Sequence, residues 1–276
     1  MVKKICLSII ALCLLGLCGC SSPKDTPTEM IKSNQPKSSS SVSLNTKCNG
    51  WGMGKDLDEK NCPISCVNFQ AKYQKFGAYF YNPPKQEGAQ KTITLTFDNG
   101  YENGFTEKIL DTLDKKQVKA VFFLTGDYAK KNAPIIEKMV SKNHVLGNHS
   151  QTHPSMPGIS VEKMKSEIQT LHKTILENFG VEMNLFRPPK GEYSEQSLAV
   201  TQEMGYKSIF WSFAYADWDP KKQPDENEAL DTLKSHLHDG AIYLLHTVSQ
   251  TNANILADFI DHAKSQGYEF IVQMQQ

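Results

Sequence analysis

Two histidines, His149 and His153, are separated by three residues in the segment His-Ser-Gln-Thr-His. Around a short turn, this spacing can direct two imidazoles at one divalent ion and leave positions open for water and a substrate carbonyl. Water bound to such an ion can lose a proton near neutral pH. Asp98 and Asn99, which follow an apolar run, add a carboxylate and an amide oxygen. These residues predict a hydrolytic metal centre.

Reactive side chains follow five of the apolar runs that we expect to be strands. In chain order they are Asp98 and Asn99, then His149 and His153, then Arg187, then Asp217 with Trp218, and last His246. In a β/α barrel the carboxyl ends of the strands meet at one face, where active sites are built. We therefore expect these side chains on one rim of the molecule.

After Gln90, short apolar runs alternate with segments of helical periodicity, which is typical of a β/α fold with a parallel sheet. The expected strands are 92–97, 118–124, 144–147, 184–186, 208–211, 241–245 and 269–272. The expected helices are 104–116, 133–142, 161–179, 194–204, 228–237 and 252–266. This pattern predicts a distorted (β/α) barrel of about seven parallel strands. An open doubly wound sheet is the alternative, but no glycine-rich phosphate loop follows a strand, so we expect no nucleotide.

The composition fits a single globular domain whose ligand is not selected by charge. The chain has 276 residues, 39% of them hydrophobic, which is enough for one domain of barrel size. The 30 Lys and Arg residues balance the 30 Asp and Glu residues, so no basic face indicates nucleic acid as a partner. This balance fits a substrate that is recognised by hydrogen bonds and stacking.

Residues 1–19 are predicted to be a lipoprotein signal peptide. Lys3 and Lys4 precede an almost wholly apolar run over 5–17, which leads into Cys-Gly-Cys. This end resembles a bacterial lipobox, in which the thiol of the new first residue, here Cys20, carries the lipid. A plain secretory peptide or an uncleaved membrane helix is the alternative, but the run is shorter than the roughly 20 residues that span a bilayer. We expect an exported protein, lipid-anchored at Cys20 on the outer face of the cytoplasmic membrane and facing the cell wall.

Three further segments follow the signal peptide. Residues 20–46 are rich in Ser, Pro, Lys and Thr and are predicted to be a flexible tether. Residues 47–90 contain many aromatics and are predicted to be an ordered extension lying on the catalytic domain, 91–276. Cys48, Cys62 and Cys66 are the only cysteines after Cys20, and export favours a disulfide among them that leaves one thiol unpaired. A three-cysteine zinc site is the alternative, and the pairing stays open.

Five sequence motifs, taken together and in order, resemble those of the polysaccharide deacetylases with a NodB homology domain. They cover roughly 91–272 and are TFDNG (96–100), HSQTH (149–153), RPP (187–189), DW (217–218) and LLH (244–246). Longer stretches are similar to the branch of this family that makes muramic-δ-lactam in spore cortex peptidoglycan. These are TFDNGYENG (96–104), RPPKGEYS (187–194) and WSFAYADW (211–218).

The resemblance implies a role for each catalytic residue. Asp98 would be the general base, held by a charge-assisted hydrogen bond from Arg187. His246 would be the general acid that protonates the departing amine, with Asp217 orienting its ring and raising its pKa. A backbone N–H after the Arg187 motif would help to bind the oxyanion.

The resemblance also implies which residues contact the glycan. Trp218 and Leu244 would line the groove that takes the acetyl methyl group. Tyr101 and Tyr193 could stack on sugar rings, although ordinary packing accounts for an aromatic side chain equally well. Pro188, in the third motif, is the last residue assigned to substrate contact.

The metal site departs from the common family pattern at Asn99, where an aspartate would supply the third protein ligand. The resemblance implies a divalent ion, zinc first, with cobalt or manganese as alternatives. Either His149, His153 and Asn99 hold it, or the two histidines do so with water. A degenerate domain that binds glycan without cleaving it is also consistent with the loss of the carboxylate. Because the other motif residues are all present, we favour an active enzyme.

The expected substrate is the N-acetyl group of N-acetylmuramic acid in peptidoglycan, as a step in muramic-δ-lactam formation for spore cortex. N-acetylglucosamine in peptidoglycan or in chitin-like oligomers is the alternative substrate. A non-catalytic, glycan-binding lipoprotein is the alternative from another functional class. Lactam formation requires a muramic carboxyl group that is free of its peptide, so we also expect dependence on a muramoyl-alanine amidase.

Overall fold

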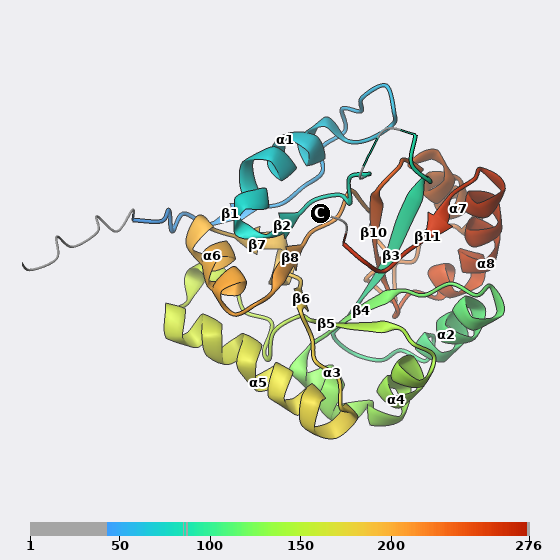
Figure 1. Cartoon of the computed structure of the whole chain (residues 1–276). Coiled ribbons are helices and arrows are strands. Elements are labelled where there is room, and N and C mark those ends of the chain that lie inside the picture. The colour runs from blue at the N-terminus through green and yellow to red at the C-terminus, as the bar shows by residue number, and fades with distance from the viewer. Residues whose placement is uncertain (1–42, 85, 87, 275–276) are drawn as a thin grey trace, which may run out of the picture. The chain divides into compact units, whose positions relative to one another are not determined.

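A single sheet of parallel strands forms the centre of the protein (Figure 1). The computed structural model describes residues 43–84, 86 and 88–274, and nine strands of this sheet lie within them. The strand order is β2-β8-β6-β5-β4-β3-β10-β9, and β11 pairs with the first residues of β3. The bounds are β2 (Ala78–Tyr79), β3 (Thr92–Asn99), β4 (Val121–Leu124), β5 (Val145–Asn148), β6 (Leu185–Phe186), β8 (Lys207–Ile209), β9 (Phe213–Ala214), β10 (Ala241–His246) and β11 (Glu269–Phe270).

The sheet curls into a half-barrel, so that strands far apart in the sheet order approach one another. The backbone N–H of Asn82, which follows β2, donates to the carbonyl of Gly240, directly before β10, at 2.7 Å. Because paired strands lie about 4.8 Å apart, this approach requires strong curvature across the intervening strands. The prediction of a distorted (β/α) barrel is confirmed.

The two faces of the sheet contribute to different cores, as the alternation of side chains along a strand requires. In β4, Phe122 and Leu124 pack in the cluster that includes the surrounding helices, whereas Val121 and Phe123 pack against other strands inside the half-barrel. The inner cluster consists of Tyr79, Val121, Phe123, Leu185, Ile209, Ile242 and Met274.

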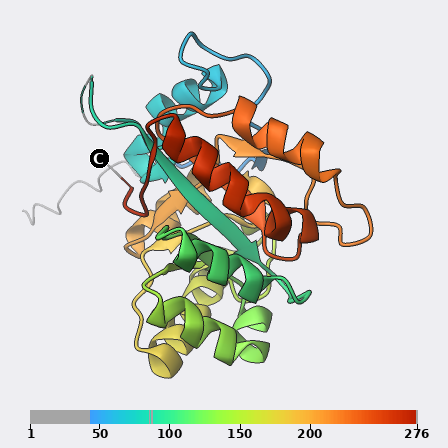
Figure 2. The same cartoon turned by 90° about the vertical axis from the view of Figure 1, so that its right-hand side faces the viewer.

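Helices lie around the outside of the strands (Figure 1). Their bounds are α1 (Ile64–Tyr73), α2 (Thr106–Lys115), α3 (Gly126–Lys131), α4 (Ala133–Ser141), α5 (Val161–Phe179), α6 (Glu195–Glu203), α7 (Glu226–Ser235) and α8 (Gln250–Ser265), with short 3₁₀ helices η1 (Gln74–Phe76), η2 (Met156–Gly158) and η3 (Pro189–Gly191). Figure 2 shows α8 beside β3, with α2 and α7 packed against α8. Within the described ranges, every helix is too short or too polar to cross a membrane.

Helix α5 shows how local sequence sets these elements. The Ser160 hydroxyl accepts the backbone N–H of Lys163 and caps the first turn. The buried residues Met164, Ile168, Leu171 and Ile175 recur every three or four positions and face the core. The helix ends at Gly180, whose φ of 67° lies in the left-handed region that glycine adopts without a steric penalty.

Residues 43–84 pack on the barrel and join the main sheet through β2. Their aromatic side chains form a cluster with residues of the barrel. The buried aromatic members are Trp51, Tyr73, Phe80, Tyr193 and Phe210. A second, two-stranded sheet pairs β1 (Asn49–Gly50) with β7 (Glu192–Tyr193) in antiparallel fashion.

The three cysteines of this segment are unpaired in the structure. Cys48 is exposed, whereas Cys62 and Cys66 are buried in the aromatic cluster. The predicted disulfide therefore stays a prediction. The predicted signal peptide, the lipidated Cys20 and residues 20–42 of the predicted tether lie outside the described residues.

Candidate active site

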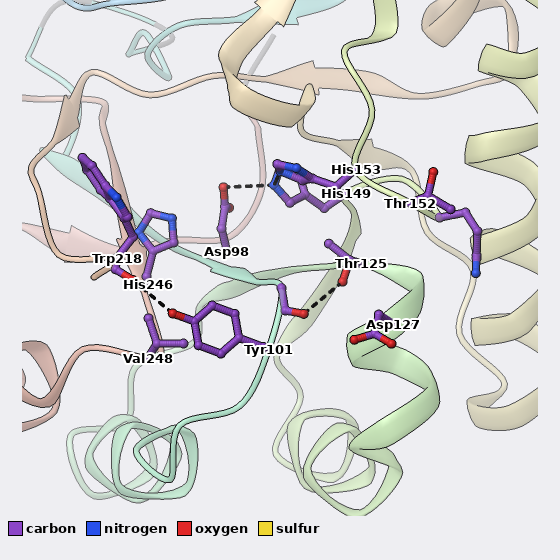
Figure 3. A pocket seen from close by; sticks show the side chains of 12 residues that line it. Asp98, Tyr101, Thr125, Asp127, His149, Thr152, His153, Trp218, His246 and Val248 are labelled. Atoms are coloured by element: carbon purple, nitrogen blue, oxygen red, sulfur yellow. Dashed lines mark hydrogen bonds and ion pairs between the residues drawn. The ribbon is translucent and has the colours of Figure 1, made fainter. Parts of the chain in front are cut away.

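A cavity of about 390 Å³ opens where the carboxyl ends of β3, β5 and β10 meet (Figure 3). Figure 3 shows His149 and His153 on one side of Asp98 and His246 on the other. The lining residues are Asp98, Gly100, Tyr101, Thr125, Asp127, His149, Gln151, Thr152, His153, Trp218, His246 and Val248. Of the side chains predicted on one rim, five line this cavity, whereas Asn99, Arg187 and Asp217 do not.

The imidazoles of His149 and His153 turn towards each other, with their Nε2 atoms 3.2 Å apart. The Nδ1 atom of His149 lies 2.8 Å from the backbone carbonyl of Arg187. Because a carbonyl oxygen only accepts, this Nδ1 carries the proton and Nε2 keeps its lone pair. Burial lowers the pKa of His149 to about 4 and also lowers the pKa of His153, so both rings are neutral at neutral pH.

The turn between the two histidines has an unusual backbone. Ser150 and His153 have φ angles of 67° and 58°, in the left-handed region that few residues other than glycine adopt. Two hydrogen bonds hold this turn. The Ser150 N–H donates to Asn148 Oδ1, and the His153 N–H donates to Ser150 Oγ, each at 2.9 Å.

The donor set suits a divalent ion with open coordination positions. Two neutral imidazoles with converging lone pairs are typical ligands of such an ion, and the Nδ1 hydrogen bond of His149 is the usual outer support. In the described part of the chain, no group of three or more His, Cys, Asp or Glu side chains has metal-binding geometry. The two imidazoles form the pair of converging donors in this cavity.

Asn99, predicted as a third ligand, is not brought to this pair. It follows Asp98 along β3, and successive strand residues point to opposite faces. Its Nδ2 atom donates to Thr247 Oγ1 at 2.7 Å, and its side chain is absent from the cavity wall. Its Oδ1 atom is buried without a hydrogen-bond partner among the described residues, so its role as a ligand stays a prediction.

Asp98 is anchored on one oxygen and faces the cavity with the other. Its Oδ1 accepts a hydrogen bond from Arg187 Nη1 at 2.7 Å, while Oδ2 lies 3.5 Å from His149 Nε2. Burial opposes the charge, but the Arg187 guanidinium, with His149 and His246, brings the pKa of Asp98 below its ordinary value. Asp98 is therefore ionised at neutral pH.

Arg187 fills the inside of the half-barrel and is fully buried. Besides Asp98, it donates to Thr96 Oγ1 and to the carbonyls of Ile209 and Phe210, at 2.8 to 3.2 Å. Its guanidinium also lies 4.2 Å from the centre of the Phe123 ring. These contacts leave Arg187 little freedom, so it holds Asp98 in one position.

His246, at the end of β10, is paired with the buried carboxylate of Asp217. Its Nδ1 atom lies 2.7 Å from Asp217 Oδ1, and its backbone N–H donates to Oδ2 at 2.7 Å. Burial lowers the pKa of the ring, but the Asp217 carboxylate outweighs it and raises the pKa above its ordinary value. Asn252 in α8 donates its Nδ2 hydrogen to Asp217 Oδ2 at 2.6 Å and completes the network.

The predicted substrate contacts divide into two groups. Trp218 and Tyr101 line the cavity, are 56% and 49% exposed, and are joined by a hydrogen bond from Tyr101 Oη to the Trp218 carbonyl at 3.3 Å. Leu244 and Pro188 are buried and do not line the cavity.

Tyr193 is not available to a sugar, because it is 1% exposed in the aromatic cluster before β3. Its ring packs edge-on against Tyr73 and Phe210, with ring centroids 5.3 and 5.2 Å apart. The β1–β7 pairing turns this residue inwards, so the prediction of Tyr193 as a substrate contact is not supported by its placement.

Several polar groups of the site were not predicted from the sequence. Thr125, Asp127, Gln151 and Thr152 form the cavity wall beyond His149 and His153. Thr125 and Asp127 follow β4, a strand end to which no motif was assigned, so only the strand-end rule could have indicated them. Asn252 lies inside a helix, and only its burial beside Asp217 reveals it.

Hydrolysis of an acylated amine requires a base that takes a proton from water and an acid that gives one to the leaving nitrogen. The cavity places an ionised carboxylate between a histidine of raised pKa and two neutral imidazoles. With the half-barrel of parallel strands, this arrangement defines a metal-dependent hydrolase of acyl groups.

The comparisons with known proteins identify the family. Residues 85–209 match the family described as "Polysaccharide deacetylase". The chain is 38% identical to the peptidoglycan-N-acetylmuramic acid deacetylase PdaA of Bacillus subtilis, over 80% of this chain and 82% of that protein. The solved structure of Bacillus subtilis PdaA, a family 4 carbohydrate esterase, superimposes with a TM-score of 0.76 at 37% identity, covering 82% of this chain and 94% of that chain. The chain belongs to the polysaccharide deacetylase family, whose members depend on a metal.

A second relative is the peptidoglycan-N-acetylglucosamine deacetylase PgdA of Listeria monocytogenes. The chain is 33% identical to it over 66% of its own length. The matched part is 38% of PgdA, so this likeness concerns a single region of a longer protein.

Proposed function

We propose that the protein removes the N-acetyl group of N-acetylmuramic acid in peptidoglycan. The observation that carries this proposal is the complete acid–base set, Asp98 with Arg187 and His246 with Asp217, around the two imidazoles of one cavity. The extent of the likeness to PdaA supports muramic acid as the sugar.

Asp98 is the base of the proposed reaction. Arg187 occupies Oδ1, so Oδ2, on the side of His149, accepts the proton of the attacking water. Because the pKa of Asp98 is below its ordinary value, the carboxylate is available over the whole neutral range. A divalent ion held by His149 and His153 would make this water more acidic and polarise the acetyl carbonyl.

His246 is the acid. Asp217 holds Nδ1, which leaves Nε2 to give its proton to the departing amine. The raised pKa keeps a larger fraction of the ring protonated at neutral pH than an isolated histidine would have. Pro188 and Pro189 lack an N–H, so the first backbone donor after Arg187 is that of Lys190, which we assign to the oxyanion.

The sugar is proposed to lie against the exposed rings of Trp218 and Tyr101, on the His246 side of the cavity. The ring centroids of Trp218 and His246 are 6.2 Å apart. An apolar sugar face stacked on these rings therefore lies beside the acid. Thr125, Gln151 and Thr152 offer hydrogen-bonding groups at the opposite wall.

Several finer features belong to the same proposal. The ion is zinc, and deacetylation is a step in muramic-δ-lactam formation for spore cortex, after an amidase has freed the muramic carboxyl group. The protein is exported and lipid-anchored at Cys20 on the outer face of the cytoplasmic membrane. The supports for these features are the sequence resemblance and the N-terminal pattern of charge and hydrophobicity.

The test compares two substrates in parallel. The protein is incubated with amidase-trimmed peptidoglycan and with chitin oligomers, and acetyl loss and lactam formation are read by mass spectrometry. Loss of acetyl groups from muramic acid is expected, with Asp98→Asn as the inactive control. Deacetylation of the chitin oligomers alone would favour N-acetylglucosamine, the sugar named in the PgdA relative. Acetyl retention on both substrates with metal supplied would contradict the proposed activity.

A further inference from the structure

A fully buried carboxylate, Glu167, lies on α5 next to the turn that carries the two imidazoles. Burying a carboxylate is costly unless strong donors surround it. Here its Oε2 accepts the Thr152 N–H at 2.7 Å, and its Oε1 accepts the Thr152 hydroxyl at 2.9 Å and lies 2.9 Å from Lys163 Nζ. Three donors from Thr152 and Lys163 thus surround the buried carboxylate.

Glu167 accepts hydrogen bonds from Thr152, the residue of the turn directly before His153. The two hydrogen bonds from Thr152 fix both its backbone and its side chain. The backbone carbonyl of Glu167 also accepts the Gln151 N–H at 3.1 Å. Two successive residues of the turn are thus tied to one residue of α5, a helix anchored in the core by its apolar face.

The two histidines differ in how they are held. His149 directly follows β5, its N–H donates to the carbonyl of Leu124 in β4, and its Nδ1 binds the Arg187 carbonyl. His153 lies beyond the strand in a left-handed conformation, which the chain adopts only when its surroundings impose it. The contacts that hold its backbone are the Ser150 hydroxyl and, through Thr152, Glu167.

We propose that Glu167 is a positioning residue that fixes the imidazole of His153 against that of His149 and thereby sets the affinity of the site for a divalent ion. The proposal rests on the metal centre of the proposed function. Outer contacts of this kind typically change metal affinity by about 10- to 100-fold when they are removed.

Three variants test this role. Glu167→Gln removes the charge, and Thr152→Val removes only the hydroxyl bond and keeps the backbone N–H. Lys163→Met is the matched control, because it removes the exposed ion-pair partner of the same carboxylate without touching the turn. This variant keeps both hydrogen bonds from Thr152 to Glu167, so its Zn²⁺ affinity is expected to equal that of the parent. Loss of the ion pair with the buried carboxylate is expected to appear in thermal stability instead.

The measurements are made on metal-free protein titrated with Zn²⁺ in a chelator competition, and with Co²⁺ followed by its visible absorption. We expect Glu167→Gln to weaken Zn²⁺ binding by about 10-fold or more and to change the Co²⁺ spectrum. Thr152→Val should weaken binding less, and Lys163→Met should not. Thermal unfolding of the metal-free proteins reports separately on the fold.

The outcomes separate this inference from the proposed function. The parent binds ions in the first outcome, but Glu167→Gln and Thr152→Val keep its Zn²⁺ affinity and Co²⁺ spectrum. Glu167 is then structural only, and the inference is overturned while the proposed function stands. If Glu167→Gln does not fold, Thr152→Val decides by the same two readings. If the folded parent binds neither ion, the metal centre itself fails, and the inference fails with it.

Discussion

Asp98 and His246 line the same cavity, yet their surroundings shift their pKa values in opposite directions. The guanidinium of Arg187 lowers the pKa of Asp98 against the effect of burial. The carboxylate of Asp217 raises the pKa of His246, also against burial. Groups whose pKa values are pushed apart in this way are suited to act as base and acid at one pH. The pairing of side chains thus assigns the two roles before any substrate is considered.

The pH dependence of the Asp217→Asn variant tests the acid. Its neutral amide no longer stabilises the imidazolium, so the pKa of His246 falls and the alkaline limb of the rate profile moves to lower pH. Turnover should drop by roughly tenfold or more, since general acid catalysis typically contributes 10²–10⁴-fold. The profile of kcat against pH, measured on muramic substrate, gives both quantities. An alkaline limb at the parent's position, in a protein of unchanged thermal midpoint, would show that another group is the acid.

At the residue scale, the sequence predicted the reactive side chains at the ends of strands and missed the buried polar residues that hold the site in place by hydrogen bonds. Asp98, His149 and His246 were found because reactive residues at the ends of apolar runs share one rim. Asn252 and Glu167 lie within helices, where a polar residue is ordinarily solvated. Their burial is a property of helix docking that local pattern does not contain. The orientation of Asn99 depends on the strand continuing through it, one residue beyond Asp98.

At the scale of elements, the longest segments were predicted, whereas most two-residue strands and the ten-residue helix α1 were missed. The expected helix over 161–179 is α5 with the same bounds, because nineteen residues give several turns of apolar periodicity. The strands β1, β2, β7 and β9 have two residues each, too few for any alternation to show. Helix α3 was missed for the same reason, since its six residues span fewer than two turns. The seven expected strands are therefore part of a nine-stranded sheet within the described residues.

The contact between β4 and β5 gives a test of how the strands support the site. A Cβ atom added at Gly147 in β5 would lie 2.4 Å from Cδ1 of Phe123 in β4. The Phe123 ring packs against the guanidinium of Arg187, which holds Asp98. Gly147→Ala should therefore cost about 1–3 kcal/mol of stability, typical of overpacking, and should also lower kcat by displacing Arg187. Urea unfolding and steady-state kinetics measure the two effects.

The matched control is Gly50→Ala in β1, where an added Cβ would meet no atom within 4 Å. Its free energy of unfolding and its kcat should equal those of the parent. If Gly147→Ala were as stable and as active as this control, the contact between Gly147 and Phe123 would not affect the position of Arg187.

At the scale of the whole molecule, the site is assembled from strands that are distant in sequence. Asp98, His149, Arg187 and His246 follow or end β3, β5, β6 and β10, which lie within the five consecutive strands β6-β5-β4-β3-β10 of the sheet. The site is therefore only as stable as the curled sheet. Burial lowers the pKa of His149 in the site and of His144 directly before β5, so the folded sheet keeps both rings neutral.

This coupling predicts that the metal-free protein loses stability in mild acid. Burial lowers the pKa of His144 and of His149 from 6.5 to about 4, and it also lowers the pKa values of His153 and His238. Between these values the unfolded chain binds protons that the native chain does not, so the stabilising contribution is present above pH 6.5 and is lost as the pH falls towards 4. His246, whose pKa is raised, acts in the opposite sense but is one group against four.

The free energy of unfolding, measured with urea in the presence of a chelator, should therefore decrease from pH 7 to pH 4.5, before most carboxylates titrate. A loss of at least about 1 kcal/mol for each of His144 and His149 is expected, since one pKa unit corresponds to 1.36 kcal/mol. His144→Gln removes one titrating group far from the catalytic residues, so its free energy should depend less steeply on pH whatever its absolute stability. Stability that stays constant or rises over this range would show that the native barrel accepts protons on these rings, and that their neutrality is not imposed by burial.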